Sequence, residues 1–249
     1  IVTSGATESV HLALLGSAAG LAPGRVVISA VEHPAVIAAA YQLEAQGWSV
    51  AEWPVDGQGV VRLNQLDQLL SAPTRLVSLT AAQGEVGALQ PLIEVAQACR
   101  ERGIVIHSDA TQLVPQGCFP FERLGVDLLT LSAHKFRGPR GVGLLIRAPG
   151  VALSTLQGGG GQEHGLRSGT EPVALVSGMA EALKALPSFD PVTHHVPPGS
   201  AVQIRRQRDQ LLERLLELPQ LRLCGPPLAD RLPHHIALLV KTADGMPLP

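Results

Sequence analysis

The feature that most constrains the fold of this sequence is its alternation of short apolar runs with longer amphipathic segments. The runs expected to form strands are VVISA (26–30), WSVAEW (48–53), LVSL (76–79), IVIHSD (104–109), LLTLS (128–132) and VGLLI (142–146). Helical patterns span about 8–19, 34–46, 63–71, 91–102 and 171–186. Such alternation is typical of a mainly parallel sheet covered by helices, so the sequence predicts an α/β fold.

One connection predicts a change of strand direction. The link between the runs 128–132 and 142–146 contains GPRG (138–141) and is too short for a crossover helix. Parallel neighbours need a connection of about a dozen residues or more. The run 142–146 is therefore expected to lie antiparallel to 128–132.

The composition of the chain changes after Leu186. The stretch 187–200 is rich in proline and predicts a linker, and it is followed by a charged helical pattern at 201–217 and the strand-like runs LRLC and HIALLV. We expect a large domain at 1–186 and part of a small α+β domain at 201–249. The chain begins without Met inside a strand-like run, so we expect both flanks of the domain pair to be missing.

Composition argues against several classes of function. The net charge is −2 and aromatic residues make up 3%, which disfavours a nucleic-acid groove. The sequence contains no apolar stretch of about 18 residues and no signal-peptide pattern, so it predicts neither a membrane span nor secretion. The three cysteines lack zinc-ligand or disulfide spacing, so no metal site is expected. A reducing cytoplasm fits these features best.

Polar residues follow several of the predicted strands at their carboxyl ends, where open parallel sheets bind ligands. The loop TSGAT (3–7) precedes a predicted helix and offers its N-terminus to an anion. The polar residues that converge on this edge are Glu32, His33, Asp109, Gln112, Ser132, His134 and Lys135.

Three of these features together indicate one kind of chemistry. A lysine amine forms a Schiff base with carbonyl compounds. A pyridine cofactor also needs a carboxylate facing its ring nitrogen and an anion cradle for its phosphate. Lys135, Asp109 and the TSGAT loop supply these three groups at compatible places.

Five ordered motifs make the sequence resemble a known family. TSGATES, EHPAV, HSDATQ, SAHKFRGPRGVG and GGGGQEHGLRSGTEP are similar to the motifs of class V aminotransferases, specifically the cysteine desulfurases of iron-sulfur assembly. The resemblance is strong over about 1–186 and weaker to 249. It implies an enzyme dependent on pyridoxal 5'-phosphate (PLP), with the aspartate aminotransferase-like fold (fold type I), that is normally a homodimer.

The resemblance also implies roles for residues around the cofactor ring. Lys135 would hold the cofactor covalently, and Asp109 would pair with the ring nitrogen. His33 would stack on the ring and help to move protons, and Gln112 would hydrogen-bond the ring hydroxyl. Lys135, His33 and Asp109 are therefore the expected catalytic residues.

A second group of residues is expected at the phosphate. The resemblance implies that Ser132, His134 and the residues Ala6 and Thr7 bind it. Thr170, in the motif RSGT, would reach the phosphate of the neighbouring subunit. These contacts would make the homodimer part of the cofactor site.

The reaction that the resemblance implies is desulfuration of L-cysteine. A mobile cysteine thiolate attacks the substrate sulfur, which gives alanine and an enzyme persulfide for a sulfur-acceptor scaffold protein. Cys99, Cys118 and Cys224 do not match that nucleophile, which we expect beyond residue 249 together with the arginine that binds the substrate carboxylate. We therefore expect this chain alone to release little or no sulfide.

Two questions stay open from the sequence. The family usually carries paired asparagines where this chain has Gln83 and Gly84, so either Gln83 takes over the contact to the cofactor hydroxyl or that hydrogen bond is lost. The cofactor motifs also leave the substrate undecided. The alternatives are another class V enzyme, such as a selenocysteine or cystine lyase or an aminotransferase, and a catalytically silent scaffold.

Overall fold

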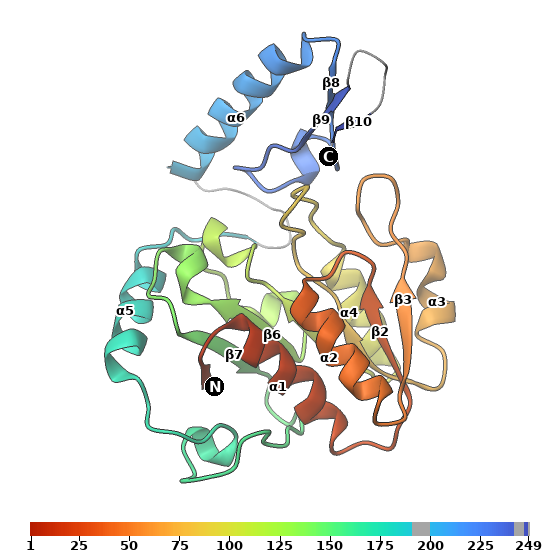
Figure 1. The fold of residues 1–249 in the computed structure, drawn as a ribbon, viewed down its shortest axis with the longest axis vertical. Helices are drawn as coiled ribbons and strands as arrows, with labels where there is room; N and C mark the ends of the chain where they lie inside the picture. Colours follow the sequence, from red (N-terminus) through yellow and green to blue (C-terminus); the bar gives the residue numbers. More distant parts are fainter. Residues whose placement is uncertain (191–199, 242–246, 249) are drawn as a thin grey trace.

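A seven-stranded sheet forms the centre of the protein, shown in the lower part of Figure 1. The computed structural model describes residues 1–190, 200–241 and 247–248. The strand order is β1-β7-β6-β5-β4-β2-β3. The bounds are Val2–Thr3 (β1), Arg25–Ser29 (β2), Ser49–Trp53 (β3), Thr74–Ser78 (β4), Val105–Asp109 (β5), Leu128–Ser132 (β6) and Gly143–Arg147 (β7).

The directions of the strands agree with the sequence. Strands β3, β2, β4, β5 and β6 are parallel neighbours, whereas β7 is antiparallel to β6 and to β1. The mainly parallel α/β sheet and the reversal at the short link 138–141 are therefore confirmed. The carboxyl ends of β2, β4, β5 and β6 meet at one edge of the sheet.

Helices cover both faces of this sheet (Figure 1). The helices α1 (Ala6–Ala18) and α2 (Pro34–Glu44) pack on one face. The helices α4 (Leu92–Glu101) and α5 (Val173–Lys184) pack on the other face. Each of these helices lies within a few residues of the range that the sequence predicts.

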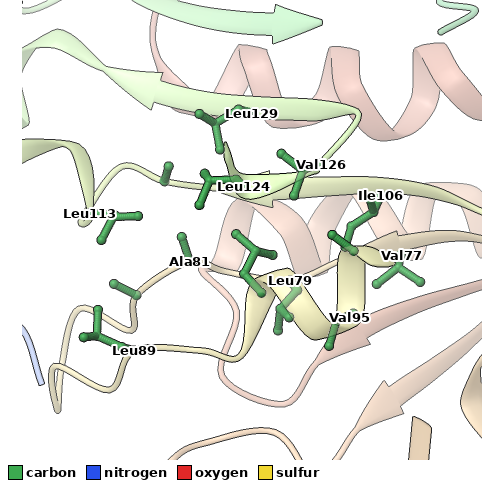
Figure 2. Packing of buried hydrophobic residues seen from close by; sticks show 14 of the residues in the cluster. Val77, Leu79, Ala81, Leu89, Val95, Ile106, Leu113, Leu124, Val126 and Leu129 are labelled. Atoms are coloured by element: carbon green, nitrogen blue, oxygen red, sulfur yellow. The ribbon is translucent and has the colours of Figure 1, made fainter. Parts of the chain in front are cut away.

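The period of two along the strands separates the core into two clusters. Val26, Leu76 and Leu128 belong to the cluster under α1 and α2. Val77 and Leu129 belong to the opposite cluster, which Figure 2 shows from close by. Full burial of one such side chain contributes about 1.5–3 kcal/mol. The sheet therefore holds its strand ends on a core that is packed on both sides.

The predicted helix 63–71 is shorter than expected. A 3-10 turn at Leu63–Gln65 leads into a four-residue helix, α3 (Leu66–Leu69). The carbonyl of Leu69 accepts hydrogen bonds from Thr74 Oγ1 (2.7 Å) and Arg25 Nη2 (3.0 Å). Because side chains at the starts of β4 and β2 satisfy the last carbonyl, the helix ends there.

The C-terminal part forms a second, smaller unit (Figure 1). It contains α6 (Ser200–Leu216) and an antiparallel sheet of β8 (Leu221–Leu223), β9 (Leu238–Lys241) and β10 (Pro247–Leu248). The helix and the strand at 221 follow the prediction, but β9 begins three residues after His235, where HIALLV was expected to start. The strand β10 was not predicted. Most of the predicted linker, 191–199, lies outside the described residues, so the domain boundaries at 186 and 201 stay a prediction.

The two units meet along one seam. Leu232 N donates to Gly87 O (2.9 Å), and Leu89 N donates to Asp230 O (3.3 Å). His235 Nε2 donates to Gly84 O (2.8 Å). The loop 83–89 of the large unit is thus tied to the segment 230–235. None of the helices in the described part of the chain has the length and apolarity needed to cross a bilayer.

Candidate active site

A cavity of about 750 Å³ lies at the carboxyl ends of the parallel strands. Parallel strands place their carboxyl ends at one edge, so polar residues that follow different strands come together there. All of the predicted site residues except Thr170 line this cavity. They are Ala6, Thr7, His33, Gln83, Asp109, Gln112, Ser132, His134 and Lys135.

Lys135 lies in a tight turn that follows β6. The turn, Ala133–Phe136, buries the side chains of Ala133 and Phe136 and leaves Lys135 exposed at the cavity. Gly138 N donates to Ala133 O (2.8 Å), and a Cβ at Gly138 would lie 2.9 Å from the Cβ of Ala133. The glycine is therefore needed to close the turn. The buried strand ends in a rigid turn that presents one amine to the cavity.

Asp109 is the last residue of β5 and is 7% exposed. Its Oδ1 accepts a hydrogen bond from Thr111 N (2.9 Å). Burial raises the pKa of this carboxyl, while the Thr111 hydrogen bonds and the charges of His33 and Lys135 act in the opposite direction. Asp109 has no ion-pair partner among the described residues. A buried carboxylate of this kind is stabilised by a cationic group that enters the cavity.

The N-terminus of α1 lies beside Ser132. The N-cap residue Gly5 offers no side chain to cap the first turn, so the helix end is open to an anion. A Cβ at Gly5 would lie 3.9 Å from Ser132 Oγ. Ser132 Oγ and His134 Nδ1 are hydrogen-bonded at 2.9 Å. Backbone and side-chain donors therefore converge on one place that suits a phosphate group.

His33 is fixed as the N-cap of α2. Its Nδ1 accepts a hydrogen bond from Ala35 N (3.1 Å). The neutral ring must then carry its proton on Nε2, because Nδ1 acts as the acceptor. The ring lines the cavity with one defined tautomer.

Gln83 and Gly84 lie in the loop that contacts the C-terminal unit. Gln83 Oε1 accepts hydrogen bonds from Glu85 N (2.6 Å) and Val86 N (2.7 Å), so the side chain stabilises its own turn. A Cβ at Gly84 would lie 2.8 Å from Gln112 Nε2, so the glycine allows Gln112 to pack closely. Whether Gln83 replaces the usual asparagine contact stays a prediction.

Several lining residues received no role from the sequence. They are Glu8, Glu32, Glu85, Thr111 and Arg140. Glu8 forms an ion pair with Arg167 (Oε1 to Nε, 2.8 Å), which ties the segment 158–172 to the start of α1. Only Glu32 had a usable signal, because it directly follows a predicted strand.

The three cysteines lie outside the lining of the cavity. Cys99 is fully buried in α4, where burial raises the pKa of its thiol to about 12. Cys99 is therefore a packing residue of the core. Cys118 is exposed and donates to Leu183 O (3.2 Å), and Cys224 is half-buried in the C-terminal unit. A thiol with a pKa near 12 is a poor nucleophile at neutral pH.

A family match agrees with this arrangement. The sequence model of the Aminotransferase class-V family matches residues 1–247. This chain belongs to the class V aminotransferase family. The fold and the order of the motifs are thereby accounted for over nearly the whole chain.

Individual members of the family are similar to this chain in sequence and in structure. The chain is 36% identical over 247 residues to "Cysteine desulfurase IscS 1" of Archaeoglobus fulgidus, covering 98% of this chain and 62% of that protein. A solved "NIFS-LIKE PROTEIN" superposes with a TM-score of 0.87 at 34% identity, covering 96% of this chain and 64% of the other. Another, "SspA in complex with cysteine", has a TM-score of 0.83 at 26% identity and covers 98% and 67%. The chain spans about half the length of the curated relatives it matches.

The family implies PLP, and the residues present fit this cofactor. The buried carboxyl of Asp109, without an ion pair among the described residues, suits a protonated pyridine nitrogen. The open N-terminus of α1 beside Ser132 and His134 suits the phosphate. The exposed amine of Lys135 in the same cavity suits the aldehyde.

Proposed function

We propose that the protein is a PLP-dependent cysteine desulfurase. The observation that carries the proposal is that one cavity collects the amine of Lys135, the buried carboxyl of Asp109 and the anion cradle at the start of α1. A structural ion pair or a simple helix N-cap would explain one of these groups, but neither explains why all three lie in one cavity. A pyridine aldehyde with a phosphate does require them.

The cofactor would be held by groups with separate tasks. Lys135 binds it covalently through Nζ, and Asp109 stabilises a proton on the ring nitrogen. Ser132, His134 and the backbone at Ala6 and Thr7 bind the phosphate.

Three further residues complete the proposed cofactor site. His33 would lie against the ring and donate through Nε2, and Gln112 would donate to the ring hydroxyl. Thr170 lies outside the lining of the cavity in this chain. That position is compatible with a contact to the phosphate of a second subunit in a homodimer.

The chemistry divides between the cofactor and the protein. When bound, PLP supplies an aldehyde that reacts with amines and a ring that withdraws electrons from the amino acid. Asp109 keeps the ring nitrogen positively charged, which strengthens that withdrawal. The amine of Lys135 would be the base that takes the α-proton of a bound amino acid, and His33, which carries its proton on Nε2, would be a proton donor in the cavity.

L-cysteine is the proposed substrate because several proteins similar to this chain point to it. Curated relatives are named cysteine desulfurases, and one solved relative is described in complex with cysteine. The products would be alanine and a persulfide on a protein cysteine. The persulfide sulfur would pass to an acceptor scaffold protein for iron-sulfur cluster or thio-cofactor assembly, in the cytoplasm.

A second candidate function rests on one observation. None of the three cysteines lines the cavity, and the class V lyases and aminotransferases need no protein thiol. A selenocysteine or cystine lyase, or an aminotransferase, therefore remains the alternative. Both candidates use the same cofactor groups.

The test of this proposal measures cofactor binding and products separately. The purified protein is titrated with PLP by visible absorbance, and the loaded protein is incubated with L-cysteine. Desulfuration by a protein thiolate predicts one sulfide for each alanine when a thiol reductant is added to release the persulfide sulfur, and no sulfide without added protein. Residues 1–249 alone are expected to give little or no sulfide, because none of their three cysteines lines the cavity. Pyruvate or a new amino acid in place of alanine would favour the alternative, and absence of a bound-cofactor absorbance band would contradict both.

A further inference from the structure

Glu32 is a buried carboxyl group that the proposed mechanism leaves unused. It follows β2, lines the cavity and is 7% exposed. Ser29 Oγ and Thr80 N each donate a hydrogen bond to its Oε1 at 2.7 Å. Its Oε2 is buried and has no hydrogen-bond partner among the described residues. A buried carboxylate with one unpartnered oxygen is costly, so its charge state needs an explanation.

The hydrogen bonds define where a proton on Glu32 would lie. Oε1 accepts from two donors, one of which is a backbone N–H, so it is the oxygen that stays unprotonated. A proton on the carboxyl therefore resides on Oε2. Protonation removes the unpartnered negative oxygen and leaves both hydrogen bonds to Oε1 intact.

A second carboxyl in the same cavity acts on Glu32. The pKa of Glu32 is raised to about 8, mainly by burial and also by the charge of Asp109, against the hydrogen bonds from Ser29 and Thr80. Thr80 connects the two residues, because it also donates through Oγ1 to Asp109 O (3.4 Å). The pKa of Asp109 is also raised by burial, but the charges of His33 and Lys135 lower it, whereas no cation among the described residues acts on Glu32.

We propose that Glu32 is a positioning residue that acts as an uncharged carboxylic acid. It fastens the loop that carries His33 to the end of β4 and leaves Asp109 as the buried anion of the pair. The other titratable groups that line the cavity are Glu8, His33, Glu85, His134, Lys135 and Arg140. Ionisation of Glu32 adds a second negative charge to the cavity that contains Asp109 and places it on a buried oxygen without a hydrogen-bond partner among the described residues.

This inference rests on the proposed function for its consequence at the cofactor. With Glu32 neutral, a cofactor bound in this cavity would share it with one buried carboxylate, Asp109. With Glu32 ionised, it would share it with two, which would change the charge balance around the cofactor. Glu32 therefore sets an alkaline limit to the state in which the site works.

The first test needs no cofactor. Unfolded glutamate loses its proton near pH 4.5 and folded Glu32 near pH 8, so the wild type loses stability as pH rises through this window. Glu32→Gln keeps an acceptor and a donor but cannot ionise. We expect the Tm of E32Q relative to wild type to rise by more than about 5 °C between about pH 5 and pH 8. Glu85→Gln, an exposed glutamate of the same cavity, is the control and should show no such rise.

Three results would overturn the proposal. They are a constant Tm difference between E32Q and wild type across this range, an equal rise in E85Q, and an E32Q that fails to fold at pH 5. Failure of E32Q to fold at pH 5 would count against the proposal because the wild-type Glu32 side chain is itself uncharged at that pH, as the glutamine is. Asp109→Asn adds a second check. It removes the negative charge that raises the pKa of Glu32, so the pH-dependent loss of stability seen in the wild type should move to lower pH in this variant.

The second test uses the protein loaded with PLP. The absorbance of the bound cofactor should change with an apparent pKa near 8 in the wild type, and this change should be lost in E32Q but retained in E85Q. An unchanged transition in E32Q overturns the proposal. If the wild type does not bind PLP, the proposed function fails, and the melting comparison still decides the charge of Glu32.

Discussion

The large unit and the C-terminal unit are stabilised by different contacts. In residues 1–190 the seven-stranded sheet carries an apolar cluster on each face. Among the described residues of the C-terminal unit, the buried side chains include two arginines, Arg208 and Arg231, beside Leu212 and Leu232. The arginines donate to backbone carbonyls at 228, 232, 224 and 226. The large unit is thus held mainly by apolar packing, and the small one depends more on polar contacts.

This difference separates the tasks of the two units. Lys135, Asp109 and the open end of α1 are placed by the densely packed sheet, so the cofactor site has a rigid base. The C-terminal unit contacts the wall of the cavity at the seam, where His235 donates to Gly84 O. We infer that the small unit adjusts the wall of the cavity, whereas the large unit sets the positions of the reacting groups.

The largest expected effect is the loss of packing in the large unit. Leu128 is fully buried between the sheet and α1, so Leu128→Ala should lower the free energy of unfolding by about 2–5 kcal/mol. Leu211→Ala, on the exposed side of α6, should change it by less than about 0.5 kcal/mol. Urea unfolding measures both. Similar losses in the two variants would contradict the difference between the units.

A smaller effect is expected in the C-terminal unit. Arg231→Met removes the donors to Pro226 O and Cys224 O and leaves these carbonyls without a partner. The expected cost is about 1–3 kcal/mol, localised to this unit. Amide hydrogen exchange should show faster exchange in β8 and β9 and unchanged protection in β5 and β6. Arg222→Ala, at an exposed residue of β8, is the control.

The smallest expected effect tests the seam. Gly87 and Gly103 both have positive φ angles, +77° and +64°. A Cβ at Gly87 would lie 2.8 Å from the Cβ of His235, whereas a Cβ at Gly103 meets nothing within 4 Å. Alanine at either position strains the backbone, so this cost is common to both variants. The close contact with His235 arises in Gly87→Ala alone, so Gly87→Ala should lower the free energy of unfolding by about 1 kcal/mol more than Gly103→Ala. Equal Tm values in the two variants would show that the seam accommodates the added methyl group at Gly87 without loss of stability.

The sequence predicted the large unit well because its signals are local and periodic. The strand patterns, and the short link before β7, each depend on neighbouring residues. The convergence of Asp109, Ser132 and Lys135 followed from the rule for parallel strands. The helix at 63–71 was overestimated because Arg25 and Thr74, distant in sequence from the helix, satisfy its last carbonyl.

The less predictable features depend on contacts between distant segments. His235 is the first residue of the strand-like run HIALLV, but it donates to Gly84 O in the loop 83–89, so β9 begins later than expected. The sequence left the role of Gln83 open, and the fold adds that its side-chain oxygen accepts from two backbone amides of its own turn. Glu32 was placed at the site by its position after a strand, but its unpartnered oxygen could be found only from the fold.

The most direct test of the central claim is to locate the cofactor on the chain. The protein is loaded with PLP, reduced with borohydride, digested and analysed by peptide mass. We predict that the cofactor mass is on the peptide that contains Lys135, and that Lys135→Ala abolishes it without changing the melting temperature. Lys184→Ala, at an exposed lysine paired with Glu181, should leave the labelling unchanged. Labelling of another lysine, or equal labelling in the Lys135→Ala variant, would contradict the assignment of Lys135 as the reactive amine.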